Sequence, residues 1–225
     1  MPGLCREPEL TTGVNMQEAG GSEPLGVAVC RLSLDPVRGR VRHPIQVGVA
    51  IRAALFVELA LAGRLVGARW PEAIGDSDTG AMMLDSVHSA VANRRRAAWK
   101  RWFNHVDADR EAATRELIAS GRWRLDGRRI IDSDAGATVL DQQKIVQLLQ
   151  SKEPPADLQT AVLALLVGGA GGAGRPAPRH SRKLAKRWLP PLLLTSGRAG
   201  DAALNSVVAS MTAIRRANPM PLLSR

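Results

Sequence analysis

Apolar residues dominate one stretch of the chain, residues 45–62, in which the polar exceptions are Gln46, Arg52 and Glu58. Alanine and leucine are frequent there and proline is absent, so the pattern predicts a helix, and Gly63 stands where a helix would end. A helix that is apolar on nearly all sides is buried, which makes this one the expected centre of the core. The two charges within it argue against a membrane span, because a span needs about 20 apolar residues without charge.

Periodic apolar positions and turn residues predict the remaining elements, most of which are helices. We expect helices at 82–103, 107–120, 137–150, 157–167 and 201–216, a β-prone run at 25–34 and a hairpin at 124–135. The hairpin rests on Asp126-Gly127, a dipeptide typical of two-residue β-turns. The expected fold is mostly α: a single globular domain of helices packed around a buried central helix, with a protruding β-hairpin.

Composition divides the chain further. Residues 1–24 are rich in Gly, Glu, Pro and Thr and predict a disordered N-terminal arm. Residues 25–225 form the domain, within which the Gly- and Pro-rich stretch 168–178 predicts a flexible linker. Cys5 and Cys30 are too few for a disulfide framework and fit a reducing, cytoplasmic location. The N-terminus lacks the apolar segment of a secretory signal.

The excess of basic over acidic residues bears on the function of the chain. The chain has 31 Lys and Arg against 21 Asp and Glu, for a formal net charge of +10. Residues 94–129 hold eleven of these cations against five acids, and residues 175–187 hold six cations and no acid. Such an excess indicates an anionic partner, either nucleic acid, an acidic membrane surface or an acidic protein, although an ordinary solvated face is the simpler alternative. Arginine suits phosphate because its planar fork donates two parallel hydrogen bonds.

No catalytic constellation stands out. The four histidines, His43, His88, His105 and His180, are scattered, and no metal, phosphate-loop or nucleophile motif is present. The sequence therefore predicts a binding protein rather than an enzyme, with no metal and no other cofactor. Arg52 has two interpretations, as a member of an internal ion pair or as a ligand-binding arginine, because an unpaired buried charge costs several kcal/mol.

The hairpin and the helix before it support two functions. A helix, Gly121 and a hairpin with Arg128 and Arg129 look like a winged-helix module, which would grip the phosphates of nucleic acid. The same hairpin could press on a membrane surface, where Ile130 and Ile131 would add apolar contact.

Three stretches resemble the Golgi phosphoprotein 3 family, which includes bacterial members. Residues 51–66, IRAALFVELALAGRLV, are similar to the signature helix of the family, with its Arg, Glu-Leu-Ala-Leu and Gly-Arg-Leu in place. Residues 78–85, DTGAMMLD, and residues 110–123, REAATRELIASGRW, are similar to two further motifs in the same order. The likeness covers about residues 25–216.

The resemblance implies both a fold and a site. It implies a mostly helical domain with a protruding hairpin that binds phosphatidylinositol 4-phosphate at a basic pocket facing the membrane. The pocket of the family uses a Trp, an Arg of the signature helix and two Arg three positions apart on a later helix. Arg52 matches the first arginine and Arg110 the second of the later pair, while Asp107 and His43 stand where the other arginine and the tryptophan would be.

The predicted function is that of a peripheral membrane protein that recognises an anionic phospholipid headgroup. The predicted headgroup ligands are Arg52, Arg110 and His43, and the predicted membrane-contacting residues of the hairpin are Arg128, Arg129, Ile130 and Ile131. The expected location is cytoplasmic, at the inner membrane face. The resemblance further implies an adaptor, with protein cargo as another partner, and nucleic-acid binding is the alternative function.

Overall fold

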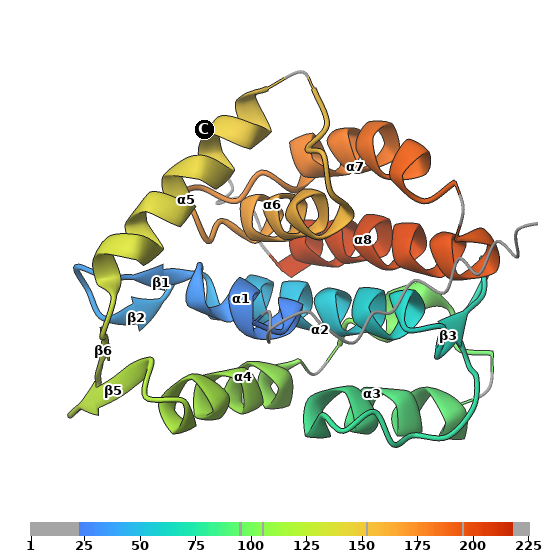
Figure 1. Cartoon of the computed structure of the whole chain (residues 1–225), viewed down its shortest axis with the longest axis horizontal. Coiled ribbons are helices and arrows are strands. Elements are labelled where there is room, and N and C mark those ends of the chain that lie inside the picture. Colours follow the sequence, from blue (N-terminus) through green and yellow to red (C-terminus); the bar gives the residue numbers. More distant parts are fainter. Residues whose placement is uncertain (1–22, 95, 105, 152, 195, 218–225) are drawn as a thin grey trace, which may run out of the picture.

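The computed structural model describes residues 23–94, 96–104, 106–151, 153–194 and 196–217, which are mostly helical with three small antiparallel sheets (Figure 1). The expected fold class is confirmed. The helices are α1 (Leu25–Arg31), α2 (Pro44–Leu61), α3 (Met82–Asn93), α4 (Asp107–Ala119), α5 (Ala135–Gln150), α6 (Leu158–Ala170), α7 (Pro178–Leu192) and α8 (Gly197–Ala217), with a 3-10 turn at Trp99–Arg101. The strands pair as β1 (Leu34–Asp35) with β2 (Arg40–Val41), β3 (Leu65–Val66) with β4 (Glu72–Ala73), and β5 (Trp123–Asp126) with β6 (Arg129–Asp132).

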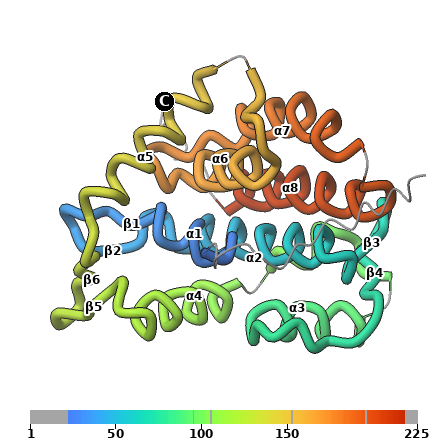
Figure 2. The backbone as a smooth tube through the Cα atoms, viewed as in Figure 1, coloured from blue at the N-terminus to red at the C-terminus, as the bar shows by residue number. Residues whose placement is uncertain are grey.

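The apolar helix α2 forms the centre of the core, as predicted. It lies between α8 on one side and α3 and α4 on the other, and α1 and α6 also pack against it (Figures 1 and 2). Phe56 of α2 meets the rings of Trp99 and Trp102 edge-on, at centroid distances of 5.4 and 5.9 Å. Within the described ranges, α2 alone is long and apolar enough to cross a membrane, but 72% of it is buried in the fold, which is typical of a core helix.

The segment predicted as a β-prone run, residues 25–34, is mostly the helix α1, so that prediction is wrong for all but its last residue. Consecutive residues of the segment, such as Val27, Ala28 and Val29, are all buried against neighbouring helices. The backbone N–H of Leu25 donates to Oε1 of Glu58 at 2.6 Å, which satisfies the start of the short helix. Tertiary packing thus overrides the β preference of the valines.

The helix predicted for residues 82–103 ends ten residues early, at Asn93. Arg94 leaves the helical region with φ −114° and ψ 76°, and Arg96 has a positive φ of 61°. The chain then turns back so that Trp99 and Trp102 enter the core beside Phe56. The break after Asn93 and the 3-10 turn that follows thus place both indoles against the ring of Phe56.

The stretch predicted as a flexible linker, residues 168–178, is partly helix. Residues 168–170 complete α6 and are buried, and α6 ends at Gly171, whose φ of +81° suits a helix C-terminus. A Cβ on Gly168 would lie 2.2 Å from Leu149, and one on Gly169 would lie 2.3 Å from Met211. These glycines therefore allow close helix packing. The predicted arm, residues 1–24, lies outside the described residues apart from Glu23 and Pro24.

The hairpin of β5 and β6 is confirmed, with Asp126 opposite Arg129 and a two-residue loop between them. Gly127, the first residue of that loop, has a φ of +58°, as this kind of turn requires. The hairpin rests on the β1–β2 turn, because the N–H of Ile130 donates to the carbonyl of Gly39 at 2.8 Å. Two short hairpins are thus bonded to each other at one end of the molecule (Figure 1).

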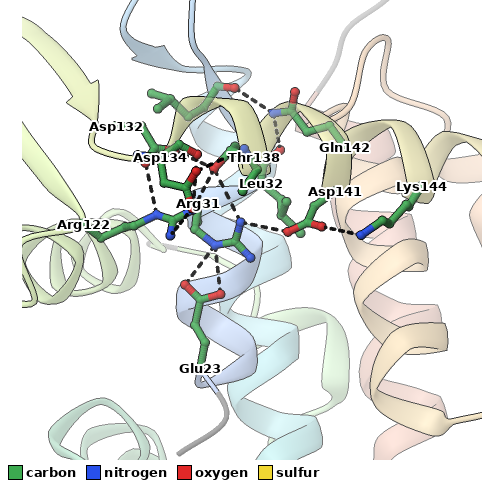
Figure 3. A network of polar contacts seen from close by, with 12 residues as sticks. Glu23, Arg31, Leu32, Arg122, Asp132, Asp134, Thr138, Asp141, Gln142 and Lys144 are labelled. Carbon is green, nitrogen blue, oxygen red and sulfur yellow. Dashed lines mark hydrogen bonds and ion pairs between the residues drawn. The ribbon is translucent and has the colours of Figure 1, made fainter.

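A network of ion pairs and hydrogen bonds joins α1 and the base of the β5–β6 hairpin to α5 (Figure 3). Arg31 of α1 donates to Asp141 of α5 at 3.3 Å. Arg122, just before β5, donates to Asp132 of β6 at 3.1 Å, and the hydroxyl of Thr138 in α5 donates to the same carboxylate at 2.6 Å. The network therefore ties the base of the hairpin to α1 and α5.

Cys30 is expected to resist alkylation in the folded protein. Its side chain is fully buried beside Thr114, and burial raises the pKa of the thiol to about 12. Because the thiolate is the reactive species, the shift from 9.0 lowers its fraction roughly a thousandfold at about pH 8, besides the loss of access. Iodoacetamide labelling of a Cys5→Ser variant, followed by mass spectrometry with and without urea, measures this. Equal labelling rates in the two conditions would contradict the burial.

Candidate functional site

A solvent-reachable hollow of about 520 Å³ lies between α4 and the two bonded hairpins. Four arginines line it: Arg40 from β2, Arg110 and Arg115 from α4, and Arg128 from the β5–β6 loop. Glu111 is the acid among the lining residues, so positive charge prevails. We call this feature the basic hollow.

Helix geometry explains how α4 supplies two of these arginines. At about 100° per residue, Arg110 and Arg115 lie about 140° apart, and Glu111, Thr114 and Ile118 fall between them on the helix surface. All five residues line the basic hollow. The hollow therefore spans the whole exposed arc of α4 that faces the hairpins, with one arginine at each edge.

The charges of the basic hollow are available to a ligand. Arg110 forms an ion pair with Asp107 at 3.4 Å, but the aspartate side chain is 69% exposed and such surface pairs hold each other weakly. Arg40, Arg115 and Arg128 are exposed and form no ion pair within the described part of the chain. An incoming anion would therefore compete with few acidic side chains for these arginines.

The floor of the basic hollow is apolar. It is formed by Val41, Pro44, Ile118, Leu125 and Ile130. Leu125 lies opposite Ile130 in the hairpin register and is 56% exposed. Guanidinium groups around exposed aliphatic surface suit an anion that is attached to apolar material.

Arg52 does not line the basic hollow. Its guanidinium forms a two-pronged ion pair with Asp109 of α4, through Nε and through Nη2, which donates to Oδ1 at 3.0 Å. Burial raises the pKa of Asp109 above its ordinary value, while the hydrogen bonds and charge of Arg52 oppose that rise. Of the two interpretations of Arg52, the structure supports the internal ion pair.

His43 also lies apart. It precedes α2 with a left-handed backbone, φ 43°, and lines a second hollow of about 820 Å³ together with Arg38, Arg42 and Arg175. This second hollow shares Arg40 with the first. The expectation that Arg52, Arg110 and His43 converge on one pocket is therefore wrong, because the central helix directs Arg52 into the core.

The hairpin residues divide between roles. Arg128 lines the basic hollow, whereas Arg129 donates from Nη2 to the carbonyl of Val37 at 3.0 Å and holds the hairpin on the turn. Ile130 faces the hollow, and Ile131, 37% exposed, points to the other face because strand residues alternate. The two isoleucines therefore do not form one contact surface, which corrects their predicted pairing.

Sequence reasoning missed Arg40, Arg115 and Leu125. The Asp126-Gly127 turn could have placed Leu125 across from Ile130 by register. A helical projection of residues 107–120 could have included Arg115 if it had allowed for a broad site. No sequence pattern pointed to Arg40, because only the contact between the two hairpins brings it close to α4.

Fold and site together define a class: a mostly helical protein around one apolar helix, with a basic, apolar-floored hollow at the hairpin end. The family model of Golgi phosphoprotein 3 (GPP34) matches residues 28–211, and the chain belongs to that family. A search of the curated proteins finds no match. Within the described ranges, no three His, Cys, Asp or Glu side chains gather as a metal site would require.

Several residues that carry the family likeness bind other parts of this chain. Glu58 caps α1, and although burial raises the pKa of its carboxyl, the N–H groups of Leu25 and Gly26 oppose that rise. Asp85 accepts from both the N–H and the hydroxyl of Thr79, each at 2.7 Å, which holds the loop before α3. Together with the Arg52–Asp109 ion pair, these contacts indicate that Arg52, Glu58 and Asp85 of the family motifs stabilise the fold.

Proposed function

We propose that this protein is a peripheral membrane protein that binds anionic phospholipid headgroups in the basic hollow and acts as an adaptor rather than an enzyme. The observation that carries the proposal is the hollow itself, with Arg40, Arg110, Arg115 and Arg128 around an apolar floor. Membership of the Golgi phosphoprotein 3 family supports it, and the likeness to that family implies phosphatidylinositol 4-phosphate as the headgroup. The proposed location is the cytoplasmic face of the membrane.

The physical argument joins charge and apolar area. A phosphate ester presents several oxygens, and arginine forks bind such groups with paired, charge-assisted hydrogen bonds. Each Lys or Arg near an anionic bilayer contributes on the order of 1 kcal/mol. Leu125 and Val37, exposed on the two hairpins, could enter the interfacial layer beside the headgroup. A multiply charged headgroup would use more of the four arginines than a singly charged one.

Neutralising the basic hollow is expected to weaken vesicle binding. The triple variant Arg40→Gln, Arg115→Gln, Arg128→Gln removes three exposed cations, so at about 1 kcal/mol each the affinity should fall about a hundredfold. Cosedimentation with phosphatidylcholine vesicles that contain phosphatidylinositol 4-phosphate measures this, and vesicles of equal charge made with phosphatidylserine test headgroup preference.

A matched control loses the same charge elsewhere. The variant Arg182→Gln, Lys183→Gln, Lys186→Gln changes three exposed cations of α7. It should retain most of the vesicle affinity. If both triples weaken binding equally, net charge rather than the basic hollow explains it and the assignment fails. Circular dichroism of both variants confirms that each is folded.

A further inference from the structure

Helix α7 carries a second basic surface, distinct from the basic hollow. Its exposed cations are Arg179, Arg182, Lys183, Lys186 and Arg187. The helix contains no acidic residue. None of these cations belongs to an ion pair with another described residue. Five charges therefore face solvent without internal compensation.

The five cations form one stripe. At about 100° per residue, they fall within an arc of about 140°, and they extend over about 12 Å of helix length. The opposite side of α7, with Leu184, Ala185 and Trp188, is buried against α6 and α8. In Figure 1, α7 and α4 lie on opposite sides of α2, so the stripe and the basic hollow belong to different parts of the molecule.

We propose that the exposed face of α7 binds nucleic acid through its phosphate backbone. The stripe presents closely spaced arginine and lysine side chains, which could each contact a phosphate of a nucleic-acid backbone. It contains no acidic side chain that would repel the phosphates. This surface differs from the α4–hairpin module, where the sequence suggested a winged helix. The proposal is independent of headgroup binding in the basic hollow.

Two other polyanionic partners fit less well. Membrane-surface helices combine a basic face with an inserted apolar face, but the apolar side of α7 is buried, and no exposed apolar residue lies between Arg179 and Arg187. Protein interfaces place aromatic and aliphatic residues at their centre and are depleted in lysine. The centre of this stripe contains Lys183 and Lys186, and phosphate contact needs no apolar centre.

Fluorescence anisotropy with a short labelled DNA duplex and the full chain tests the proposal over about 50 to 200 mM salt. The affinity should fall steeply with salt. Each lost phosphate contact changes the slope of log affinity against log salt by about 0.9, so Arg182→Gln, Lys183→Gln, Lys186→Gln should reduce its magnitude by about 2 to 3. At low salt, the same variant should bind at least about tenfold more weakly.

The matched control is Arg40→Gln, Arg115→Gln, Arg128→Gln, which loses equal charge at the basic hollow and should retain the DNA affinity. Equal weakening in both triples would indicate a general charge effect and overturn the proposal. Absence of DNA binding by the unaltered chain would overturn it too. The proposal also fails if the α7 variant keeps its DNA affinity but loses vesicle binding, because the stripe would then serve a membrane.

Discussion

Replacement of Asp109 by alanine is expected to lower the free energy of unfolding by about 3–5 kcal/mol. The reason is the guanidinium of Arg52, whose side chain is only 15% exposed and which would lose its two-pronged carboxylate partner. The remaining contact, from Nη1 of Arg52 to the carbonyl of Trp102, is long at 3.4 Å. Urea unfolding followed by circular dichroism measures the loss, which for a chain of this size corresponds to about 6–20 °C in Tm.

Two further variants separate the causes. Asp107→Ala removes a carboxylate two residues earlier on the same helix, where the pair with Arg110 is exposed, and should change stability by less than about 1 kcal/mol. The double variant Arg52→Met, Asp109→Leu removes both charges and should be more stable than Asp109→Ala alone, because no buried charge is left unpaired. If Asp107→Ala and Asp109→Ala cost the same, the ion pair does not support the core.

Replacement of Gly39 by alanine is expected to separate the two hairpins and to abolish most vesicle binding. Gly39 has a φ of +61°, and a Cβ there would lie 2.8 Å from the carbonyl oxygen of Ile130. The backbone cannot move aside without losing the hydrogen bond from Ile130 to Gly39, so the basic hollow should open along the hairpin contact. Urea unfolding and vesicle cosedimentation together measure the two effects.

Gly127 provides the control for backbone strain. Its φ of +58° is nearly the same, but a Cβ there would meet nothing within 4 Å. Gly127→Ala should therefore show only the cost of a left-handed alanine, about 1–2 kcal/mol, and should retain much of the vesicle affinity. Closely similar losses in the two variants would mean that the contact between the hairpins contributes nothing.

The central helix and the β5–β6 hairpin could be predicted because their causes are local. An apolar run without proline specifies a buried helix, and Asp126-Gly127 specifies a tight turn. The helix α1 was missed because its capping acceptor, Glu58, lies 33 residues away. A short valine-rich segment has no helical signal of its own, so only the packing on α2 decides its conformation.

The site was harder to predict than the fold. The family likeness pointed to Arg52, yet its partner Asp109 lies 57 residues along the chain, and no spacing rule joins the two. The likeness also pointed to Arg110, which does line the basic hollow. Arg40 and Arg128 come together because two hairpins are bonded to each other through backbone atoms of Gly39 and Ile130, which lie 91 residues apart, and no sequence pattern joins these two positions.

The bond between Ile130 and Gly39 has a mechanical consequence. The strand β2 continues through His43 directly into α2, the most deeply enclosed helix. A load applied at the β5–β6 tip therefore passes through the β1–β2 turn to the middle of the molecule. The β5–β6 hairpin is thus coupled to that helix through the β1–β2 hairpin as well as through its own two ends.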